Sequence, residues 1–127
     1  DLKPMGLKRS YNNFFFMQGD IFKEETISFL AEKGPYDTIL SDAAPATTGN
    51  RTIDTGRSFS LVEQIIGLSN PLLKKGGSMV LKIFQGGDQK ELFDYMKTIF
   101  ESVKTFKPKA VRKESFEIYF IGTEYKG

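Results

Sequence analysis

The 127-residue chain contains no cysteine, no histidine and no tryptophan. Without cysteine it can form neither disulfide bonds nor thiolate metal sites. That composition fits a reducing cytoplasm, where we expect the protein to work. The absence of histidine excludes a Ser-His-Asp triad and a His-ligated zinc ion within the chain, and we expect no metal site. Any proton transfer near neutral pH must therefore use lysine, aspartate, glutamate or tyrosine.

Long apolar runs are also missing. No stretch of about 18 apolar residues predicts a membrane span, and the start of the chain, DLKPMGLKRS, lacks the apolar region of a signal peptide. Apolar residues make up 39% of the chain and charged residues 27%, and the formal net charge is +2. These values are typical of a soluble globular protein. The length, with no visible linker or repeat, predicts a single domain over residues 1–127.

Short apolar runs alternate with amphipathic stretches along the chain. The predicted strands are 14–17, 38–41, 78–84, 103–106 and 116–123, and the predicted helices are 21–32, 57–74 and 88–101. The residues from 43 to 56 are predicted to form a loop. Pro71 is expected to kink or split the second helix, and the Lys74–Gly77 run to end it.

Strands that alternate with helices predict an α/β fold with a mostly parallel sheet. The strand at 78–84 has apolar residues at nearly every position, which predicts burial on both faces. The connection between the last two strands is too short for a crossover helix. The last strand should therefore run antiparallel to its neighbours.

Three ionisable residues are predicted to meet at one edge of this sheet. Asp42 follows the strand at 38–41, and Lys82 lies late in the strand at 78–84. Glu117 lies near the start of the last strand, which is at the same edge because that strand is reversed. Open α/β sheets bind ligands at the carboxyl ends of their parallel strands. A buried ammonium group is costly unless it is paired, so we predict an acid–lysine–acid site here.

Each candidate also has a purely structural interpretation. Asp42 could cap the turn that follows it, Lys82 could extend to solvent from an edge strand, and Glu117 could be an ordinary exposed strand residue. Asp20 lies between a predicted strand and a helix, where an N-cap is the first interpretation. Asp1 could simply be the first residue of the chain.

A basic segment follows the strand at 103–106. Its cations are Lys107, Lys109, Arg112 and Lys113. Most runs of charge are only solvated, but this one is predicted to lie at the same edge as the acid–lysine–acid site. We therefore expect it to bind phosphate groups.

Five segments of the chain carry a family resemblance: DLKPM, QGDI, SDAAPATTG, LLKKGGSMVLKIFQGG and RKESFEIYFIGT. In this order they resemble the FtsJ/RrmJ family of ribose 2′-O-methyltransferases. The resemblance implies a Rossmann-like class I S-adenosylmethionine-dependent methyltransferase fold with an antiparallel last strand. It implies catalytic roles for Lys82, Asp42 and Glu117, and binding of S-adenosyl-L-methionine by Asp1, Asp20 and Asp42.

The resemblance also implies that part of the domain lies before Asp1. The family's first strand, its Gly-rich cofactor loop and its first catalytic lysine precede that position. We expect residues 1–127 to be the C-terminal portion of a longer methyltransferase domain whose N-terminal strands are missing from this chain. Without those strands, residues 14–17 would lack a partner and the sheet would expose an apolar edge. The 127 residues alone should bind the cofactor poorly.

The predicted function is 2′-O-methylation of a ribose in RNA by a monomeric enzyme, with a uridine of large-subunit (23S) ribosomal RNA as the expected target. Lys82 would contact the ribose hydroxyl, either as an ammonium that stabilises developing alkoxide or as a neutral amine that accepts the proton. A transfer RNA target, or a non-catalytic RNA-binding or assembly module of the same fold, stays open. A nicotinamide-dependent oxidoreductase is disfavoured because no G-x-G-x-x-G loop is visible.

Overall fold

The computed structural model describes residues 6, 14–43, 45, 48–86, 89–108 and 117–127. Four helices and four strands are found in this part of the chain. Their order is α1 (Glu24–Lys33), β1 (Tyr36–Ser41), α2 (Arg51–Gly67), α3 (Ser69–Leu72), β2 (Leu73–Phe84), α4 (Gln89–Ile99), β3 (Phe100–Phe106) and β4 (Glu117–Tyr125). None of these helices is long and apolar enough to cross a lipid bilayer.

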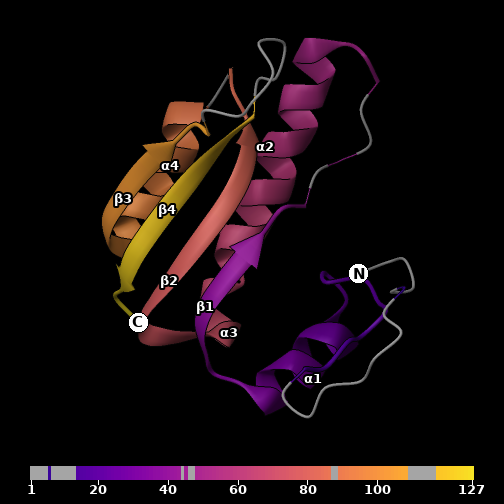
Figure 1. Ribbon diagram of the computed structural model, residues 1–127, viewed down its shortest axis with the longest axis vertical. Coiled ribbons are helices and arrows are strands. Elements are labelled where there is room, and N and C mark those ends of the chain that lie inside the picture. The colour runs from indigo at the N-terminus through magenta and orange to yellow at the C-terminus, as the bar shows by residue number, and fades with distance from the viewer. Residues whose placement is uncertain (1–5, 7–13, 44, 46–47, 87–88, 109–116) are drawn as a thin grey trace.

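The strands form one sheet in the order β1-β2-β4-β3 (Figure 1). β1 pairs with β2 in parallel, and β4 lies between β2 and β3, antiparallel to both. Consequently β1, β2 and β3 point in one direction and β4 points in the other. The predicted α/β fold with a reversed last strand is confirmed.

The core lies on one face of the sheet. Met79, Leu81 and Ile83 of β2 and Ile118 and Phe120 of β4 are buried, because side chains on a strand alternate between its faces. They pack against buried apolar residues of α2 and α4. On the other face, alternate residues of β2 such as Val80 are half-buried. The strand is therefore fully buried on one face and partly on the other.

Gly122 of β4 lets the side chains of Phe100 and Met96 pack directly against the backbone of the strand. A Cβ at this position would lie 2.8 Å from the Phe100 ring and 2.9 Å from the Met96 methyl group. Both of those side chains are almost fully buried. Any side chain at residue 122 would thus push the end of α4 away from the sheet.

The strand predicted at residues 14–17 is wrong for this structure. The segment forms no strand, and Phe14, Phe15 and Phe16 are exposed. A single strand gains stability only by pairing with a neighbour, and none of the four strands described pairs with this segment. The Phe15 ring instead lies 4.7 Å from the Lys33 ammonium group of α1.

The second helix begins and ends earlier than predicted. The Asn50 side chain accepts a hydrogen bond of 3.2 Å from the Ile53 N–H and caps the helix there, so α2 starts at Arg51 within the predicted loop. The helix ends at Gly67, and α3 follows as a separate turn containing Pro71. The predicted split near Pro71 is confirmed.

The Lys74–Gly77 run does not end a helix, contrary to the prediction. It lies within β2, where the pairing with β1 shifts. Tyr36 lies opposite Leu73, whereas Thr38 lies opposite Ser78. The extra residues of β2 between these pairs form a bulge, and Gly76 has a φ of +84°, which glycine adopts readily.

Candidate active site

Lys82, Asp42 and Glu117 meet at the carboxyl ends of β1 and β2, as the sequence predicts. The Lys82 Nζ atom lies 3.4 Å from Asp42 Oδ1 and 3.9 Å from Glu117 Oε1. β2 lies between β1 and β4, so the interpretation of Lys82 as an edge-strand residue is wrong. These three side chains, here called the charged cluster, come from segments far apart in the chain.

Strand register explains why the charged cluster forms. Lys82 lies opposite Tyr119, and Phe84 lies opposite Glu117. Because side chains alternate, Lys82, Tyr119 and Glu117 share one face of the sheet. On the other side of β2, Ser41 lies opposite Leu81, which places the next residue of the chain, Asp42, beside Lys82.

The three charged groups differ in exposure. The Lys82 side chain is 12% exposed, whereas those of Asp42 and Glu117 are 76% and 41% exposed. The ammonium group is thus largely withdrawn from water but compensated by two carboxylates, which avoids the cost of an unpaired buried charge. The carboxylates remain open to an incoming ligand.

Tyr119 belongs to the same site, although the sequence analysis gave it no role. Its hydroxyl donates a hydrogen bond of 3.1 Å to Asp42 Oδ1. That bond, followed by burial and the negative charges of Asp42 and Glu117, raises the pKa of Tyr119 above its ordinary value of 10.0. Tyr119 therefore stays protonated at neutral pH and keeps donating to Asp42. Tyr119 lies two residues from Glu117 on one strand, so both side chains face the same side of the sheet, and this spacing could have identified Tyr119 from the sequence.

Asp20 is not the N-cap of α1, which corrects the first interpretation. The N-cap residue is Lys23. The Asp20 carboxylate accepts a hydrogen bond of 3.0 Å from the Phe22 N–H and so shapes the turn before the helix. This turn brings Asp20 to the wall of the cavity that also contains Asp42.

That cavity has a volume of about 860 Å³. Ligand pockets in proteins measure roughly 300–1,000 Å³. One group of lining residues is polar or small: Gly19, Asp20, Ser41, Asp42 and Ala43. The rest are mainly apolar residues of β1, α1, α2 and α3, among them Leu30, Ile39, Leu61, Ile65, Leu68 and Leu72. The cavity thus offers two carboxylates together with a large apolar wall.

Lys107 lies at the same edge of the sheet. Its Nζ atom donates a hydrogen bond of 3.0 Å to Gln85 Oε1, directly after the end of β2. The other predicted cations of the basic segment, Lys109, Arg112 and Lys113, lie outside the described residues, as does Asp1.

The sequence patterns also gave no indication of two buried polar residues of α2, Asp54 and Ser58. The Asp54 carboxylate accepts hydrogen bonds from the Thr48 N–H (2.8 Å), the Thr48 hydroxyl (2.8 Å) and the Gly49 N–H (3.2 Å). The Thr48 N–H bond is the main reason that the pKa of Asp54 lies below its ordinary value. The Ser58 hydroxyl accepts a bond of 3.1 Å from the Phe84 N–H.

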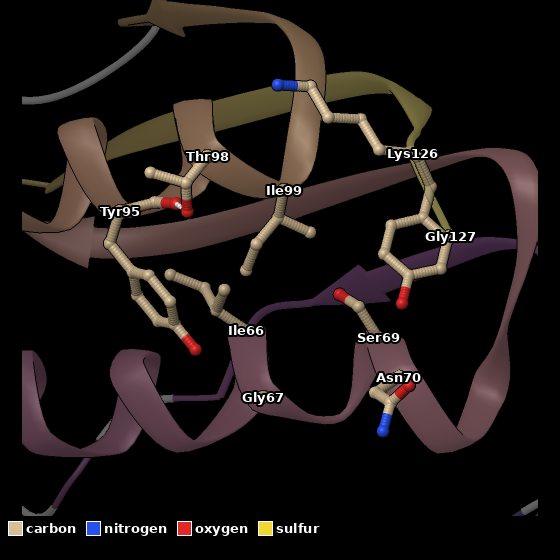
Figure 2. A pocket seen from close by; sticks show the side chains of 10 residues that line it. Ile66, Gly67, Ser69, Asn70, Tyr95, Thr98, Ile99, Lys126 and Gly127 are labelled. Atoms are coloured by element: carbon tan, nitrogen blue, oxygen red, sulfur yellow. Dashed lines mark hydrogen bonds between the residues drawn. The ribbon is translucent and has the colours of Figure 1, made fainter.

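A smaller hollow of about 190 Å³ lies at the opposite end of the sheet. Figure 2 shows Tyr95 on one side of it and Ser69 and Asn70 on the other. It contains no carboxylate, and its one lysine, Lys126, donates to the Lys97 carbonyl oxygen at 3.4 Å. The larger cavity beside the charged cluster is therefore the better candidate for a ligand site.

A solved structure shares this fold. A provisionally assigned ribosomal RNA methyltransferase from Plasmodium falciparum matches with a TM-score of 0.78 and 28% sequence identity, over 94% of this chain and 68% of that one. The strand order and this likeness define the class of fold, that of the α/β methyltransferases. The model of the FtsJ-like methyltransferase family matches residues 1–125, and the chain belongs to that family.

Curated relatives named "Ribosomal RNA large subunit methyltransferase E" match almost the whole chain. The protein from Borreliella afzelii is 48% identical over 125 residues, which cover 98% of this chain and 66% of the relative. The protein from Treponema denticola is 47% identical over 127 residues, which cover 100% of this chain and 64% of the relative. The chain thus spans slightly less than two thirds of these relatives.

Proposed function

We propose that the protein transfers a methyl group from S-adenosylmethionine to a ribose 2′-hydroxyl in RNA. The observation that carries the proposal is the charged cluster, in which the Lys82 ammonium lies 3.4 Å and 3.9 Å from two carboxylates. The proposed target is a uridine of large-subunit ribosomal RNA, in keeping with the names of the relatives. The enzyme acts as a monomer in the cytoplasm.

The cavity beside β1 suits the cofactor. When bound, S-adenosylmethionine supplies a methyl group activated by its sulfonium charge. Asp20 and Asp42 line the cavity, and their carboxylates can accept hydrogen bonds from hydroxyl or amino groups and attract a cation. Asp1 is the proposed third cofactor-binding acid.

Lys82 is the proposed contact for the reacting ribose hydroxyl. Asp42 and Glu117 hold its ammonium group in one place, which orients the hydroxyl oxygen before the reaction. As an ammonium, Lys82 stabilises negative charge that develops on the oxygen; as a neutral amine, it accepts the hydroxyl proton. Tyr119 holds Asp42 in place through its hydrogen bond of 3.1 Å.

The basic segment is the proposed contact for RNA phosphates. Lys107, Lys109, Arg112 and Lys113 would each neutralise phosphate charge and release bound cations. The position of Lys107 beside Gln85, at the edge of the sheet that carries the charged cluster, supports this role.

We also propose that residues 1–127 form the C-terminal portion of a longer methyltransferase domain. The Leu40 side chain on β1, one of the two edge strands of the sheet, is 74% exposed. The apolar wall of the cavity borders the same strand. A preceding segment that pairs with β1 would cover both, and this chain matches only 64–66% of its relatives' length.

Lys82→Ala in the complete protein tests the proposed function. Transfer of labelled methyl groups to large ribosomal subunits is measured, and nuclease mapping locates the modified ribose. The variant should lose about 10²–10⁴-fold in rate, the usual contribution of a positioned acid or base, while equilibrium dialysis shows unchanged cofactor binding. Lys74→Ala is the matched control, since Lys74 lies on the same strand, is 62% exposed and pairs with Asp37.

Three results would change the proposal. Near-normal turnover of Lys82→Ala would remove Lys82 from the mechanism. Methylation of transfer RNA instead of ribosomal RNA would change the substrate and leave the chemistry intact. RNA binding without any methyl transfer by the unaltered protein would support a non-catalytic module.

A further inference from the structure

Two buried side chains of α2, Asp54 and Ser58, accept hydrogen bonds from segments outside the helix, and one of these segments is the end of β2. Asp54 and Ser58 lie one turn apart on this helix, and both are only 3% exposed. Asp54 accepts three hydrogen bonds from Thr48 and Gly49, which follow the end of β1. Ser58 accepts the Phe84 N–H at the end of β2, just beyond Lys82.

The segment that Asp54 holds is itself exposed to solvent. Thr48, Gly49 and Asn50 are exposed, and the backbone at Gly49 has a φ of +85° with open space around it. Exposed connecting segments are usually more mobile than the helices and strands that they join. Here a buried carboxylate accepts hydrogen bonds from two backbone N–H groups and a hydroxyl, which fixes the shape of an exposed segment one helical turn from the contact between α2 and the end of β2.

This segment lies apart from the proposed cofactor cavity. Asp42 and Ala43 line the cavity, but among the residues described none from 48 to 50 does so. A fixed, solvent-facing segment that lies beyond the cofactor wall is suited to contact the other substrate. Since that substrate is RNA in the proposed function, the inference rests on that proposal.

We infer that Asp54 is a positioning residue, which holds residues 48–49 as part of the surface that receives the RNA. Asp54 touches neither the reacting atoms nor the cofactor. Its removal should therefore weaken productive RNA binding and leave the methyl-transfer step itself nearly unchanged.

The first test measures amide hydrogen exchange in the complete protein without RNA. In Asp54→Ala the Thr48 and Gly49 amides should exchange at least about tenfold faster, because each loses its hydrogen-bond acceptor. The Ile65 and Ile66 amides near the end of α2 should keep their protection. Asp37→Asn is the control, since the Asp37 side chain is 89% exposed and pairs only with Lys74 among the interactions described.

The second test separates RNA binding from chemistry. Asp54→Ala should raise KM for RNA about tenfold, the size expected when one or two hydrogen bonds are lost, with kcat and the Kd for S-adenosylmethionine within about twofold. Asp54→Asn keeps one acceptor oxygen and should show a smaller rise. Thr48→Val should raise KM by about threefold, whereas Thr48→Ser, which keeps the hydroxyl, should raise KM less.

The inference is overturned if the Thr48 and Gly49 amides lose protection while KM for RNA stays unchanged, because Asp54 would then be structural only. A fall in kcat at constant KM would overturn it too. If Asp54→Ala does not fold, the same measurements on Thr48→Val test the inference, because Thr48 is exposed and its substitution should not prevent folding. If the unaltered protein transfers no methyl groups, the proposed function is wrong, whatever the role of Asp54. The affinity of the unaltered protein and of Asp54→Ala for RNA, measured by direct titration, would then test that role.

Discussion

Helices cover the two sides of the sheet unequally, where one side is the edge formed by β1 and the other is formed by β2, β4 and β3. β2, β4 and β3 are covered by α2 and α4, and their inward side chains form a continuous core. β1 and β3 are the two edge strands; β1, here called the outer strand, borders the cavity, and its Leu40 side chain is 74% exposed. Figure 1 shows α1 standing apart from the sheet beyond this strand.

The charged cluster lies where these two sides meet. Lys82 and Glu117 come from strands of the covered side, whereas Asp42 follows β1. A rigid core thus sets the position of the ammonium and one carboxylate, and the second carboxylate is supplied by the outer strand. Changes in the covered side should therefore affect stability, and changes at the outer strand should affect ligand binding.

The largest effect on stability is expected from Phe120→Ala. Phe120 is fully buried and its ring contacts the Phe93 ring at a centroid distance of 5.6 Å. Removing a buried phenylalanine ring costs about 3–5 kcal/mol in the free energy of unfolding. Urea denaturation followed by circular dichroism measures the loss. Phe106→Ala on the exposed end of β3 is the control, and an equal loss there would refute the difference between the two sites.

A smaller effect is expected at acid pH from Asp54, which anchors residues 48–49 to α2. Hydrogen bonds from Thr48 and Gly49, together with the charge of Arg57, lower its pKa from the ordinary value of 3.8. Its contribution to stability is therefore complete above pH 3.8 and is lost as the pH falls through the lowered folded-state pKa. The difference in Tm between the unaltered protein and Asp54→Asn should shrink below that pH. A constant difference down to the acid-unfolding range would contradict this.

The smallest effect is expected from Leu40→Thr. Threonine suits a strand as well as leucine does, and the exposed side chain has little burial to lose. In the 127-residue chain the free energy of unfolding should change by no more than about 0.5 kcal/mol. In the complete protein the loss should be larger, because the proposed preceding segment would bury this position. Equal effects in the two proteins would contradict the proposed coverage of β1.

Sequence patterns were enough to predict how the charged cluster assembles. Asp42 and Lys82 end parallel strands, and the short connection before β4 required that strand to be reversed. These facts placed Glu117 at the same edge, and the ion pairs of 3.4 Å and 3.9 Å confirm the prediction. The directions of the strands were sufficient for this prediction.

Other features depended on partners that local patterns do not show. Three phenylalanines at 14–16 have the composition of a strand, but they form none, and none of the strands that the structure describes lies beside them as a pairing partner. The bond between Tyr119 and Asp42 joins positions separated by 77 residues. The start of α2 at Arg51 depends on the Asn50 cap. The residues around this cap are rich in threonine and glycine, a composition that predicts a loop.

The reversal of β4 also decides where Gly127 lies. Because this strand runs away from the charged cluster, Gly127 is carried to the far end of the sheet, where β2 begins (Figure 1). A label or a surface attachment at Gly127 would therefore lie far from the charged cluster. The protein could be immobilised there with the edge that carries the charged cluster still facing solution.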